Sequence, residues 1–592
     1  LNQALDFLIA EHAYVNELEA KLLGQSIVFK DIGDHILERN IYGVDINEES
    51  VEIARLSLWL RTATKGRKLN DLSANIKCGN SLIDDPAVAG AKVFDWKKEF
   101  PAVFAKGGFD VVIGNPPWGA DLNEDDLSFI KARDEDIVVR MIDSFMFFVS
   151  AALRISQPEG RLGQIVPDVI LYQTDNRKLR EKLLRETHLE RAINLGDGIF
   201  QDVARPSAIV ICSKRQSSTA RTLVGSVQKN FDDDLESLNL EPVEQSLLLR
   251  MPNSMFPTVN LSGYALLSRL NFPKLLSYLD DDGVQRGVSP DLKEAFIVDD
   301  RIVETNRLEL EYVKSTVTGG VDVRRFGIDN DMKRLLYVSR EVDASQIRNI
   351  VEYISRFRDK ITCTEVSQGK HPFYALHRPR DPAIFEKSGK LVGVITGDRI
   401  IVALDASRIY PTDGLYVFSS NGRQLSNKAL GCLLNSTLLT YLYRLLSSET
   451  GRTMAQVKPV LVEELPIAAP SAKGVEHLEQ LHDRIAQDMA SLREIQLGVN
   501  HLLQSKYTLP TLSRALENWP GLEFKGFLAE LKKAKVQLTL AEEAEWLTYF
   551  TAEKAKAQTL QAQIAKTDKE IDALVYELYG LTEEEVKVVE GK

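Results

Sequence analysis

Short apolar runs alternate with helical patterns through residues 1–213, and this alternation constrains the fold more than any other feature of the sequence. Two stretches, 49–63 and 144–156, space their apolar side chains three and four positions apart, which is typical of amphipathic helices. The runs that read as buried strands are 41–46, 73–80, 109–117, 160–167, 189–196 and 207–213. Strand and helix in rotation predict a Rossmann-like α/β domain with a doubly wound parallel sheet, whose ligands lie at the carboxyl ends of the strands.

The pattern of predicted secondary structure changes after residue 213. From 214 to 467, strand-like pieces are separated by polar, Gly-containing turns. Two helices are expected in this region, at 344–361 and 427–446. The mixture indicates an α+β domain with less regular connections than the first.

The last part of the chain is predicted to be a helical region, 468–592. Its first residues, 468–474, have the Pro, Ser and Gly of a linker. Long apolar stripes with three- and four-residue spacing follow. Near the end, Thr582 and Glu585 form a capping-box pattern for a last short helix.

Composition excludes several classes of protein. At 592 residues the chain is long enough for several domains, and no run of ~18 apolar residues predicts a membrane span. Its eight histidines form no ligand pair such as His-Glu-x-x-His, so no metal site is expected. The four cysteines lie far apart and form no Cys-x-x-Cys or Cys/His motif: Cys78, Cys212, Cys363 and Cys432. A disulfide scaffold and a structural zinc are therefore not expected, and a prokaryotic cytoplasm is the predicted location.

Charge is distributed unevenly along the chain. The formal net charge is -12, but residues 331–460 hold 19 Lys and Arg against 12 Asp and Glu, a local +7 that leaves about -19 for the rest. A polyanion responds to such local charge within a Debye length of ~8 Å. The middle domain is therefore the predicted nucleic-acid contact, with a solvated surface as the alternative.

The strongest chemical signal is Gly-Asn-Pro-Pro-Trp at 114–118, directly after a predicted strand. Each proline fixes φ and lacks an N–H group, so the pair ends the strand and stiffens the turn. Asn115 offers a side-chain oxygen beside the Pro116 carbonyl, and Trp118 adds a flat apolar face. Two acceptors can take both N–H bonds of an exocyclic amine on a flipped base, which frees its lone pair to attack an electrophilic methyl group. A rigid turn with a packed Trp is the alternative.

With this motif the sequence resembles the DNA adenine-N6 methyltransferases of the γ order, including type IIG restriction–modification enzymes. Their Asp/Asn-Pro-Pro-aromatic signature is matched by Asn115, Pro116, Pro117 and Trp118, which the resemblance makes the catalytic residues. It implies a methyltransferase domain at 1–213, S-adenosylmethionine as cofactor, and double-stranded DNA as the substrate. Trp118 would stack on the flipped adenine.

The resemblance also assigns cofactor-binding positions. Asp45 stands where the family has an acidic residue for the ribose hydroxyls, and Ile46 would lie against the cofactor's adenine ring. Asn80 replaces an Asp that in many relatives accepts from the 6-amino group, and Ser81 follows it. Phe200 resembles a residue that borders the target-base pocket. An ordinary strand end, an ordinary turn and a core Phe are the alternatives.

One family element is absent from the sequence. The glycine-rich loop that holds the methionine moiety of the cofactor does not occur, and the helix that should follow it begins at Leu1. We therefore expect the chain to be the C-terminal part of a longer polypeptide and to bind cofactor poorly by itself. A degenerate enzyme without methyl-donor binding is the alternative.

The region 214–467 resembles the target-recognition domain of the same enzymes. The stretches that carry the likeness are 285–298, 335–340, 370–380 and 433–467. Arg side chains on loops can bridge guanine O6 and N7 or a phosphate. The predicted DNA contacts are Lys370, His377, Arg378, Arg380, Arg452, Gln456 and Lys458, with solvated surface as the alternative.

Together these features predict a site-specific DNA adenine-N6 methyltransferase module of a restriction–modification or phage-defence enzyme. The alternative is a DNA-recognition subunit of a BREX-like defence system, with methylation lost or dependent on partner subunits. Type IIG relatives carry a nuclease on the same polypeptide. Glu523 and Lys525 match only a fragment of a nuclease motif, so any endonuclease is expected upstream of Leu1.

Overall fold

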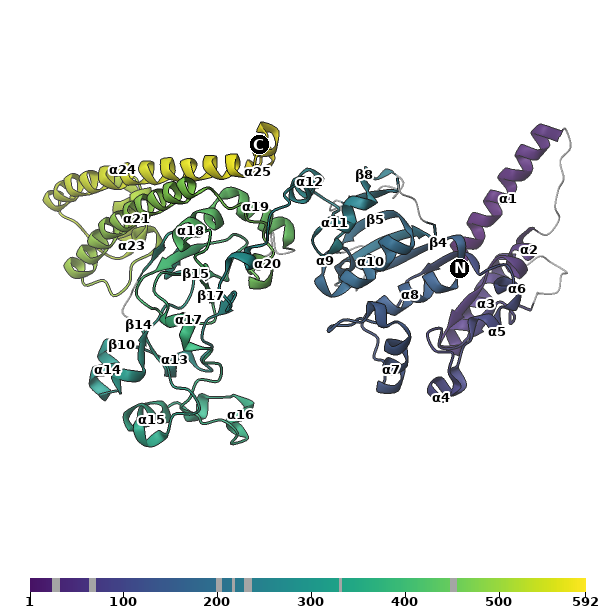
Figure 1. The fold of residues 1–592 in the computed structure, drawn as a ribbon, viewed down its shortest axis with the longest axis horizontal. Coiled ribbons are helices and arrows are strands. Elements are labelled where there is room, and N and C mark those ends of the chain that lie inside the picture. The colour runs from purple at the N-terminus through teal and green to yellow at the C-terminus, as the bar shows by residue number, and fades with distance from the viewer. Residues whose placement is uncertain are drawn as a thin grey trace. The chain divides into compact units, whose positions relative to one another are not determined.

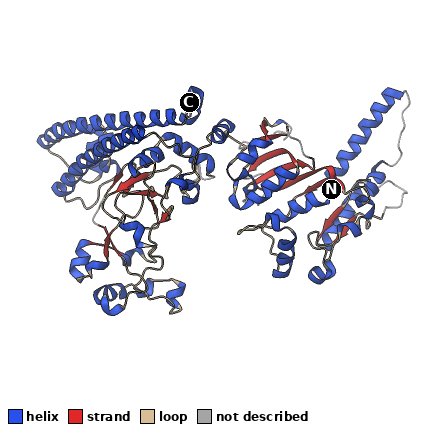
Figure 2. Cartoon of the chain, viewed as in Figure 1, coloured by secondary structure: helices blue, strands red, loops and turns tan. Residues whose placement is uncertain are grey.

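The computed structural model describes residues 1–23, 32–62, 71–197, 205–215, 219–227, 237–329, 333–447 and 455–592. The chain divides into two compact units, Leu1–Leu261 and Ser262–Lys592, and both mix helices with strands (Figures 1 and 2). None of the helices in the described ranges combines the length and apolar character that a membrane span requires.

The first unit begins with a small parallel sheet. Strand β1 (Gly43–Asp45) pairs with β2 (Ile76–Cys78), and the register joins Asp45 to Cys78. Helices α1 (Asn2–Leu23), α2 (Ile32–Arg39) and α3 (Glu48–Thr62) contribute to the core on this sheet. Both strands lie within the runs predicted at 41–46 and 73–80.

A six-stranded sheet forms the rest of the first unit, in the order β3-β4-β6-β5-β7-β8. Its strands are β3 (Phe109–Gly114), β4 (Ser156–Pro167), β5 (His188–Gly196), β6 (Ser207–Ser213), β7 (Arg221–Ser226) and β8 (Glu241–Glu244). The sheet continues past residue 213, because β7 pairs with β5 and β8 pairs with β7. Strand β3 lies at the edge, where Val111 and Ile113 are exposed.

The sheet is mixed, whereas the sequence pattern predicted a parallel one. Strand β3 is parallel to β4, and β5 is parallel to β7, but β6 is antiparallel to both β4 and β5. The connection between Gly196 and Ser207 explains the difference. A parallel return needs a crossover of about a dozen residues or more, usually with a helix, while a shorter connection suits antiparallel neighbours.

Helix α8 (Phe145–Ile155) is the main core helix of this sheet. Its side chains are buried almost all round, as expected for a helix that is apolar on every face. On α10 (Arg177–Glu186), the buried Arg180 donates to the carbonyls of Ile170, Gln173, Asn253 and Ser254. The other helices of this unit are α4 (Pro86–Ala89), α5 (Trp96–Glu99), α6 (Pro101–Phe104), α7 (Glu124–Arg133), α9 (Val169–Tyr172) and α11 (Gln245–Arg250).

The second unit contains a four-stranded antiparallel sheet, β16-β15-β17-β9, and a three-stranded one, β10-β14-β11. The strands are β9 (Gln285–Arg286), β10 (Ile297–Asp299), β11 (Val313–Ser315), β12 (Val323–Arg324), β13 (Gly327–Ile328), β14 (Lys333–Leu336), β15 (Lys390–Val394), β16 (Val402–Asp405) and β17 (Leu415–Phe418). The helices among them are α12 (Leu261–Arg269), α13 (Lys293–Phe296), α14 (Asp300–Asn306), α15 (Arg348–Ser355), α16 (Thr364–Ser367) and α17 (Pro382–Glu386).

The helix predicted at 427–446 is two helices, α18 (Asn427–Asn435) and α19 (Thr437–Leu446). Ser436 separates them, because its backbone is extended and its side chain accepts the Leu439 N–H. Serine is a preferred N-cap, so a new helix starts where the periodic apolar pattern continues. The break was invisible to periodicity alone.

The helical C-terminal region packs on the same unit. Helix α21 (Ala472–Tyr507) lies beside α24 (Leu540–Leu578), as Figure 1 shows. The segment predicted as a linker is partly buried: Ala468 donates its N–H to the Tyr579 hydroxyl, and Ser471 caps α21. The capping box of α25 (Glu583–Glu590) forms as predicted. Shorter helices are α20 (Pro459–Glu463), α22 (Arg514–Glu517) and α23 (Phe524–Lys533).

A buried ion pair joins two strands of the second unit. Lys390 on β15 and Asp405 on β16 face each other in the register, and their side chains are 0% and 1% exposed. Lys390 also donates to the Phe385 carbonyl at 2.7 Å. Burial lowers the pKa of Lys390, although Asp405 opposes this shift.

Replacing Lys390 by methionine leaves Asp405 as an unpaired buried charge, and we expect a loss of about 3–5 kcal/mol in opening free energy. The double variant Lys390→Met/Asp405→Asn removes both charges and should recover most of that loss. Amide hydrogen exchange of β15 and β16 measures the opening free energy of the unit. Equal losses in the single and double variants would contradict the pairing.

Candidate functional site

The Asn-Pro-Pro-Trp motif forms a corner directly after strand β3. The strand ends at Gly114, which pairs with Gln164 of β4. A Cβ at Gly114 would lie 2.7 Å from the Gln164 side-chain oxygen, so a residue with a side chain would displace Gln164. Asn115 is exposed, Pro116 is buried and Pro117 is exposed. The corner is therefore anchored through Pro116 and presents Asn115 outward.

Two side chains from the segment before α8 fix the far side of this corner. Ser144 is buried, and its hydroxyl donates to the Pro117 carbonyl at 2.7 Å and accepts the Ala120 N–H at 3.0 Å. Asp143 accepts the Gly119 N–H at 2.8 Å and lies 3.5 Å from the Arg205 guanidinium. Gly119 has φ of 72°, a conformation that favours glycine. The turn is held by hydrogen bonds from Asp143 and Ser144.

Trp118 is half-buried and packs against the core around α8. Its indole nitrogen is buried and has no hydrogen-bond partner among the described residues. The Asn115 side chain likewise makes no hydrogen bond within the described part of the chain, but it is exposed. Asn115 thus keeps its acceptor and donor groups available at the end of β3.

The predicted cofactor residues gather at the carboxyl ends of β1 and β2. The Asp45 carbonyl accepts the Gly79 N–H at 2.9 Å, which places Asn80 next to this pair of strands. Asp45 is exposed, and its Oδ1 accepts the Asn47 N–H at 2.8 Å. Ile46 is 56% exposed. The structure brings Asp45, Ile46 and Asn80 together, as the sequence predicted for their strand ends.

Asn80 and Ser81 shape the turn that follows β2. The Asn80 side-chain oxygen accepts the Leu82 N–H at 3.1 Å, and the Ser81 carbonyl accepts the Trp96 indole N–H at 2.9 Å. Asn80 is therefore partly engaged within its own turn, while its amide nitrogen is left for an acceptor. Phe200, the predicted neighbour of the target base, lies outside the described residues.

A cluster of aromatic rings joins the starts of β1 and β3. Tyr42, just before β1, contacts Phe109 at the start of β3 with ring centroids 5.6 Å apart. Trp96 contacts Phe109 at 5.6 Å as well. Edge-to-face pairs of this kind contribute about 0.5–1.5 kcal/mol beyond their buried area. The cluster fixes the small sheet against the strand that leads to Asn115.

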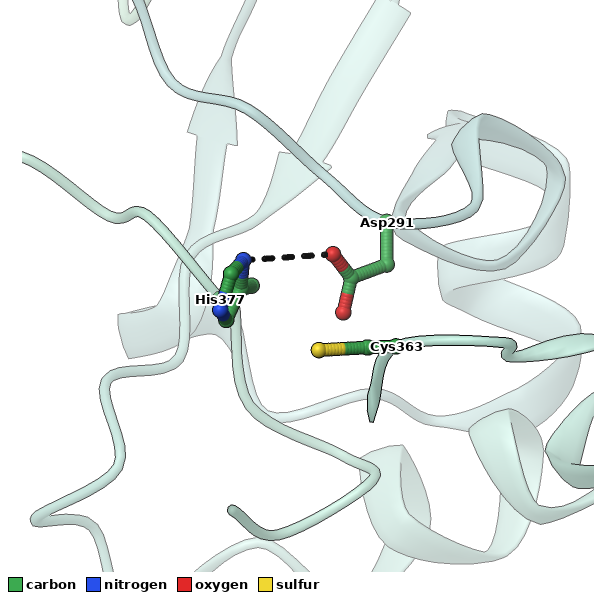
Figure 3. A group of neighbouring side chains, drawn as sticks. All are labelled: Asp291, Cys363 and His377. Carbon is green, nitrogen blue, oxygen red and sulfur yellow. Dashed lines mark ion pairs between the residues drawn. The ribbon is translucent and has the colours of Figure 1, made fainter. Parts of the chain in front are cut away.

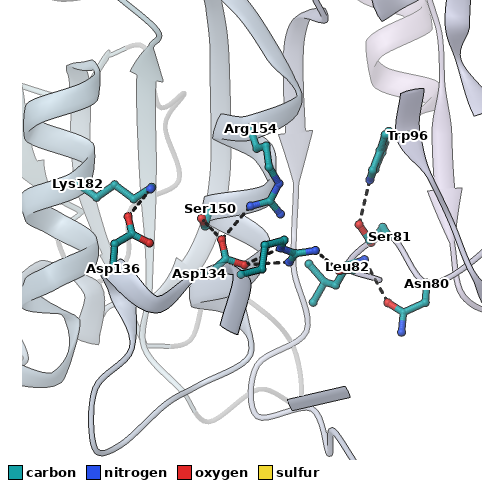
Figure 4. Close-up of polar contacts among 10 residues, drawn as sticks. Asn80, Ser81, Leu82, Trp96, Asp134, Asp136, Ser150, Arg154 and Lys182 are labelled. Carbon is teal, nitrogen blue, oxygen red and sulfur yellow. Dashed lines mark hydrogen bonds and ion pairs between the residues drawn. The ribbon is translucent and has the colours of Figure 1, made fainter. Parts of the chain in front are cut away.

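A polar network makes a second connection between the two sheets. The Arg133 guanidinium donates to the Leu82 carbonyl and, at 2.9 Å, to the Asp134 carboxylate. Asp134 also accepts from Ser150 and Arg154, both at 2.8 Å (Figure 4). Burial raises the pKa of Asp134, but Arg154, Ser150 and Arg133 together hold it below its usual value. The network ties the turn after β2 to α8.

In the second unit, the predicted DNA-contacting residues lie in two segments. Lys370, Arg378 and Arg380 are exposed, and the Arg380 carbonyl accepts from the Tyr337 hydroxyl at 2.9 Å. Gln456 and Lys458 are also exposed, next to Tyr443. Arg452 lies outside the described residues.

His377 differs from the other predicted DNA contacts. Its ring nitrogens face two carboxylates, Asp291 at 3.7 Å and Glu365 at 3.3 Å. Its side chain is 25% exposed. A DNA contact by His377 would have to displace these carboxylates.

Sequence patterns did not predict the supporting residues of the corner and turn. Asp143, Ser144 and Arg133 lie far from positions 82 and 115–120 in the sequence, and each acts on a backbone group. A single Ser or Asp before a helix normally indicates a cap. Here the Ser144 side chain makes no capping bond and turns to the corner instead.

Replacing Ser144 by alanine removes both hydrogen bonds to the corner, each contributing about 0.5–1.5 kcal/mol. Amide exchange in the peptide 115–122 should accelerate about 2- to 12-fold, since the Ala120 N–H loses its acceptor. Asn115→Ala is the matched control, because the Asn115 side chain holds no backbone group. Unchanged exchange in Ser144→Ala would contradict the role of this serine.

Family models match three parts of the chain. Residues 39–200 match the Eco57I restriction-modification methylase, and residues 317–467 match the TaqI-like C-terminal specificity domain. Residues 471–575 match a domain of unknown function, DUF8810. The first match contains the corner and the β1–β2 strand ends, and the second contains Lys370, Arg378 and Arg380.

Two curated relatives are restriction–modification proteins. A type II restriction enzyme and methyltransferase of Methanocaldococcus jannaschii is 24% identical over 65% of this chain and 29% of its own length. The type II restriction enzyme and methyltransferase RM.Eco57I of Escherichia coli is 28% identical over 35% of this chain and 21% of its own length. The chain therefore spans less than a third of either relative.

One solved structure has a similar fold over the whole chain. The type IIL restriction–modification enzyme MmeI, solved in complex with DNA, has a TM-score of 0.52 at 12% identity. The match covers 99% of this chain and 75% of that one. Residues 39–200 are thus similar to an Eco57I-type restriction–modification methylase and residues 317–467 to a TaqI-like C-terminal specificity domain, and the chain is like the type IIG restriction–modification methyltransferases.

Proposed function

We propose that this chain is the module of a restriction–modification or phage-defence enzyme that methylates adenine N6 at a specific DNA site. The observation that carries the proposal is the corner after β3, which leaves Asn115 exposed on a backbone fixed by two prolines and by Ser144. The match to a methylase family over 39–200 supports methyl transfer, and the specificity domain at 317–467 supports DNA as the substrate.

The proposed role of the corner is to hold an exocyclic amine by its two N–H groups. The Asn115 amide oxygen and the Pro116 carbonyl each accept one of them. Accepting both favours a pyramidal nitrogen whose lone pair is no longer spread into the ring. No strong base is needed before the methyl is attacked, because the proton can leave the nitrogen afterwards. Because prolines and hydrogen bonds hold the corner, little reorganisation should accompany the step.

The adenine must leave the duplex to reach this corner, at a cost of a few kcal/mol. Trp118 offsets part of that cost by stacking on the flipped base, which is typically worth about 1–3 kcal/mol. Trp118 is half-buried, and its contacts with the core fix the orientation of the ring. Phe200 is the proposed second face of the pocket.

Residues at the ends of β1 and β2 fit S-adenosylmethionine as the methyl donor. Asp45 is exposed, and in the described part of the chain nothing hydrogen-bonds its second carboxylate oxygen, which suits a ribose hydroxyl. Ile46 offers exposed apolar surface to an adenine ring, and Asn80 and Ser81 line the adjoining turn. When bound, the cofactor supplies an electrophilic methyl group. We propose a Rossmann-like arrangement for these strand ends.

The specificity domain is proposed to read the DNA site. Arg378 and Arg380 are exposed on one segment, and Gln456 and Lys458 on another. Arg forks that reach guanine edges give specificity, while contacts to phosphate only position the duplex. The rival function, DNA recognition without methylation, uses the same domain. It differs only in that the corner at Asn115 would not take part in methyl transfer. An endonuclease on the same polypeptide stays a prediction from the resemblance.

Replacing Asn115 by alanine should abolish DNA methylation and leave duplex binding within about twofold of the parent, because Asn115 contacts only the flipped base in this proposal. Transfer of labelled methyl groups from S-adenosylmethionine measures the first quantity, and a gel-shift titration measures the second. The protein for both assays is produced from its complete gene.

Asp45→Ala serves as the contrasting variant. It should raise the KM for S-adenosylmethionine at least tenfold with no change in duplex binding, since its carboxylate is assigned to the cofactor. Loss of duplex binding together with methylation in Asn115→Ala would refute the assignment of roles. Absence of methylation by the parent protein, with normal DNA binding, would favour the recognition-only rival.

A further inference from the structure

A second cluster of reactive side chains lies in the other unit, away from the corner after β3. Asp291, Cys363 and His377 come from three separate segments, and one potential metal-ligand atom of each lies within 4.8 Å of the others (Figure 3). They line a cavity of about 350 Å³ together with Thr362, Thr364 and Glu365. Cysteine, histidine and aspartate together form a donor set typical of zinc.

Charge around the cluster favours a bound cation. The Asp291 side chain is only 17% exposed although its backbone is exposed, and Glu365 lies on the other side of the His377 ring. Among the described residues, neither carboxylate forms an ion pair with a lysine or arginine. The Glu365 side chain is 58% exposed and is solvated, whereas the charge of the shielded Asp291 carboxylate can be balanced by His377 or by an added cation.

The two ring nitrogens of His377 face different carboxylates, which indicates which nitrogen would bind a metal and which would be held by a neighbouring side chain. Nδ1 faces Asp291 at 3.7 Å, and Nε2 faces Glu365 at 3.3 Å. A neutral imidazole that carries its proton on Nε2, the nitrogen nearest Glu365, presents the Nδ1 lone pair on the side of Asp291. Carboxylates commonly orient metal-binding histidines in this way. Glu365 is thus a positioning residue and Nδ1 the ligand atom.

Distances among the ligand atoms are close to those of a tetrahedral site. Zinc bonds of about 2.0 Å to nitrogen and oxygen and about 2.3 Å to sulfur place tetrahedral ligands roughly 3.3 Å apart for a nitrogen–oxygen pair and roughly 3.5 Å apart for a pair that includes sulfur. The 3.7 Å between His377 Nδ1 and Asp291 Oδ1 is about 0.4 Å longer than this, and the 4.8 Å bound on the set means that the Cys363 sulfur must move closer by about 1.3 Å at most. Thiolate and imidazole favour zinc over magnesium or calcium, which prefer oxygen ligands.

We propose that Asp291, Cys363 and His377 bind a zinc ion, with a water molecule in the fourth position. The ion joins the segment before α13, the start of α16 and the stretch 370–380. His377 directly precedes Arg378, whose carbonyl accepts the Ser289 N–H at 3.2 Å. The metal therefore fixes the backbone that carries Arg378 and Arg380. This last consequence rests on the proposed function, whereas the metal site does not.

A cluster without metal is the rival explanation. In that case His377 is protonated and pairs with Asp291 and Glu365, and Cys363 has no part in the contact. The cysteine therefore distinguishes the two explanations. Its substitution should remove zinc binding but would leave a His–carboxylate network intact.

Zinc content and affinity of the full chain provide the test, measured in the absence of DNA and S-adenosylmethionine. The parent protein should hold one zinc per chain by elemental analysis. Competition with a chromophoric chelator should show affinity reduced by more than about 100-fold in Cys363→Ser, beyond the 10–100-fold loss typical of an outer partner. The loss of zinc affinity in Glu365→Ala should lie within about 10- to 100-fold. Cys78→Ser is the matched control, because Cys78 is a half-buried free cysteine in the other unit.

Cobalt substitution gives a readout that does not depend on stability. The parent protein and Cys78→Ser should show a thiolate-to-cobalt absorption band, which Cys363→Ser should lack while its circular dichroism is unchanged. Absence of stoichiometric zinc in the parent, or parent-like affinity in Cys363→Ser, would overturn the site. Weaker duplex binding by zinc-stripped protein supports the link to Arg378 and Arg380. If the parent protein holds one zinc but binds the duplex equally well with and without it, the link to Arg378 and Arg380 is wrong, while the metal site is still supported.

Discussion

Two consecutive prolines at the end of β3 are the constraint on which the rest of the site depends. They remove two backbone donors and fix two φ angles, so the chain cannot continue as a strand and must turn. The structure resolves this turn with Gly114 beneath the Gln164 side chain and Ser144 bonded to Pro117 and Ala120. Asn115 is left exposed between the end of β3 and the turn that Asp143 and Ser144 hold. The proposed function needs such a held backbone, because a weakly held loop would not keep two acceptors aimed at one nitrogen.

The two halves of the proposed active site belong to different sheets. Asp45 and Asn80 lie on the β1–β2 pair, whereas Asn115 follows β3 in the six-stranded sheet. Their connection in the described residues comes from side chains: the rings of Tyr42, Trp96 and Phe109, and the buried Asp134 with its arginines. Aromatic contacts and charge-assisted hydrogen bonds are directional. They can therefore fix the relative orientation of two sheets that no strand pairing joins.

Local signals in the sequence predicted the strands of the first unit up to residue 213, the turn at Pro116 and Pro117 and the capping box at Thr582. They failed where the outcome depends on contacts between distant segments. The antiparallel insertion of β6, the break at Ser436 and the contact of Ala468 with Tyr579 each follow from a pairing, cap or hydrogen bond that periodicity does not encode. The Asp291–Cys363–His377 cluster is the extreme case, because no spacing rule joins three residues from three loops. Its formation depends on how Ser289 pairs with Arg378.

The identity of the methylated base tests the central claim most directly. DNA incubated with the protein and S-adenosylmethionine, then digested to nucleosides and analysed by mass spectrometry, reports every methylated base. A corner that grips an exocyclic amine by two acceptors predicts methylation of such an amine, which is N6-methyladenine in the proposed function, and no change at ring carbons. Methylation of cytosine at C5 would contradict the account, because a ring carbon offers no N–H groups to Asn115 and Pro116.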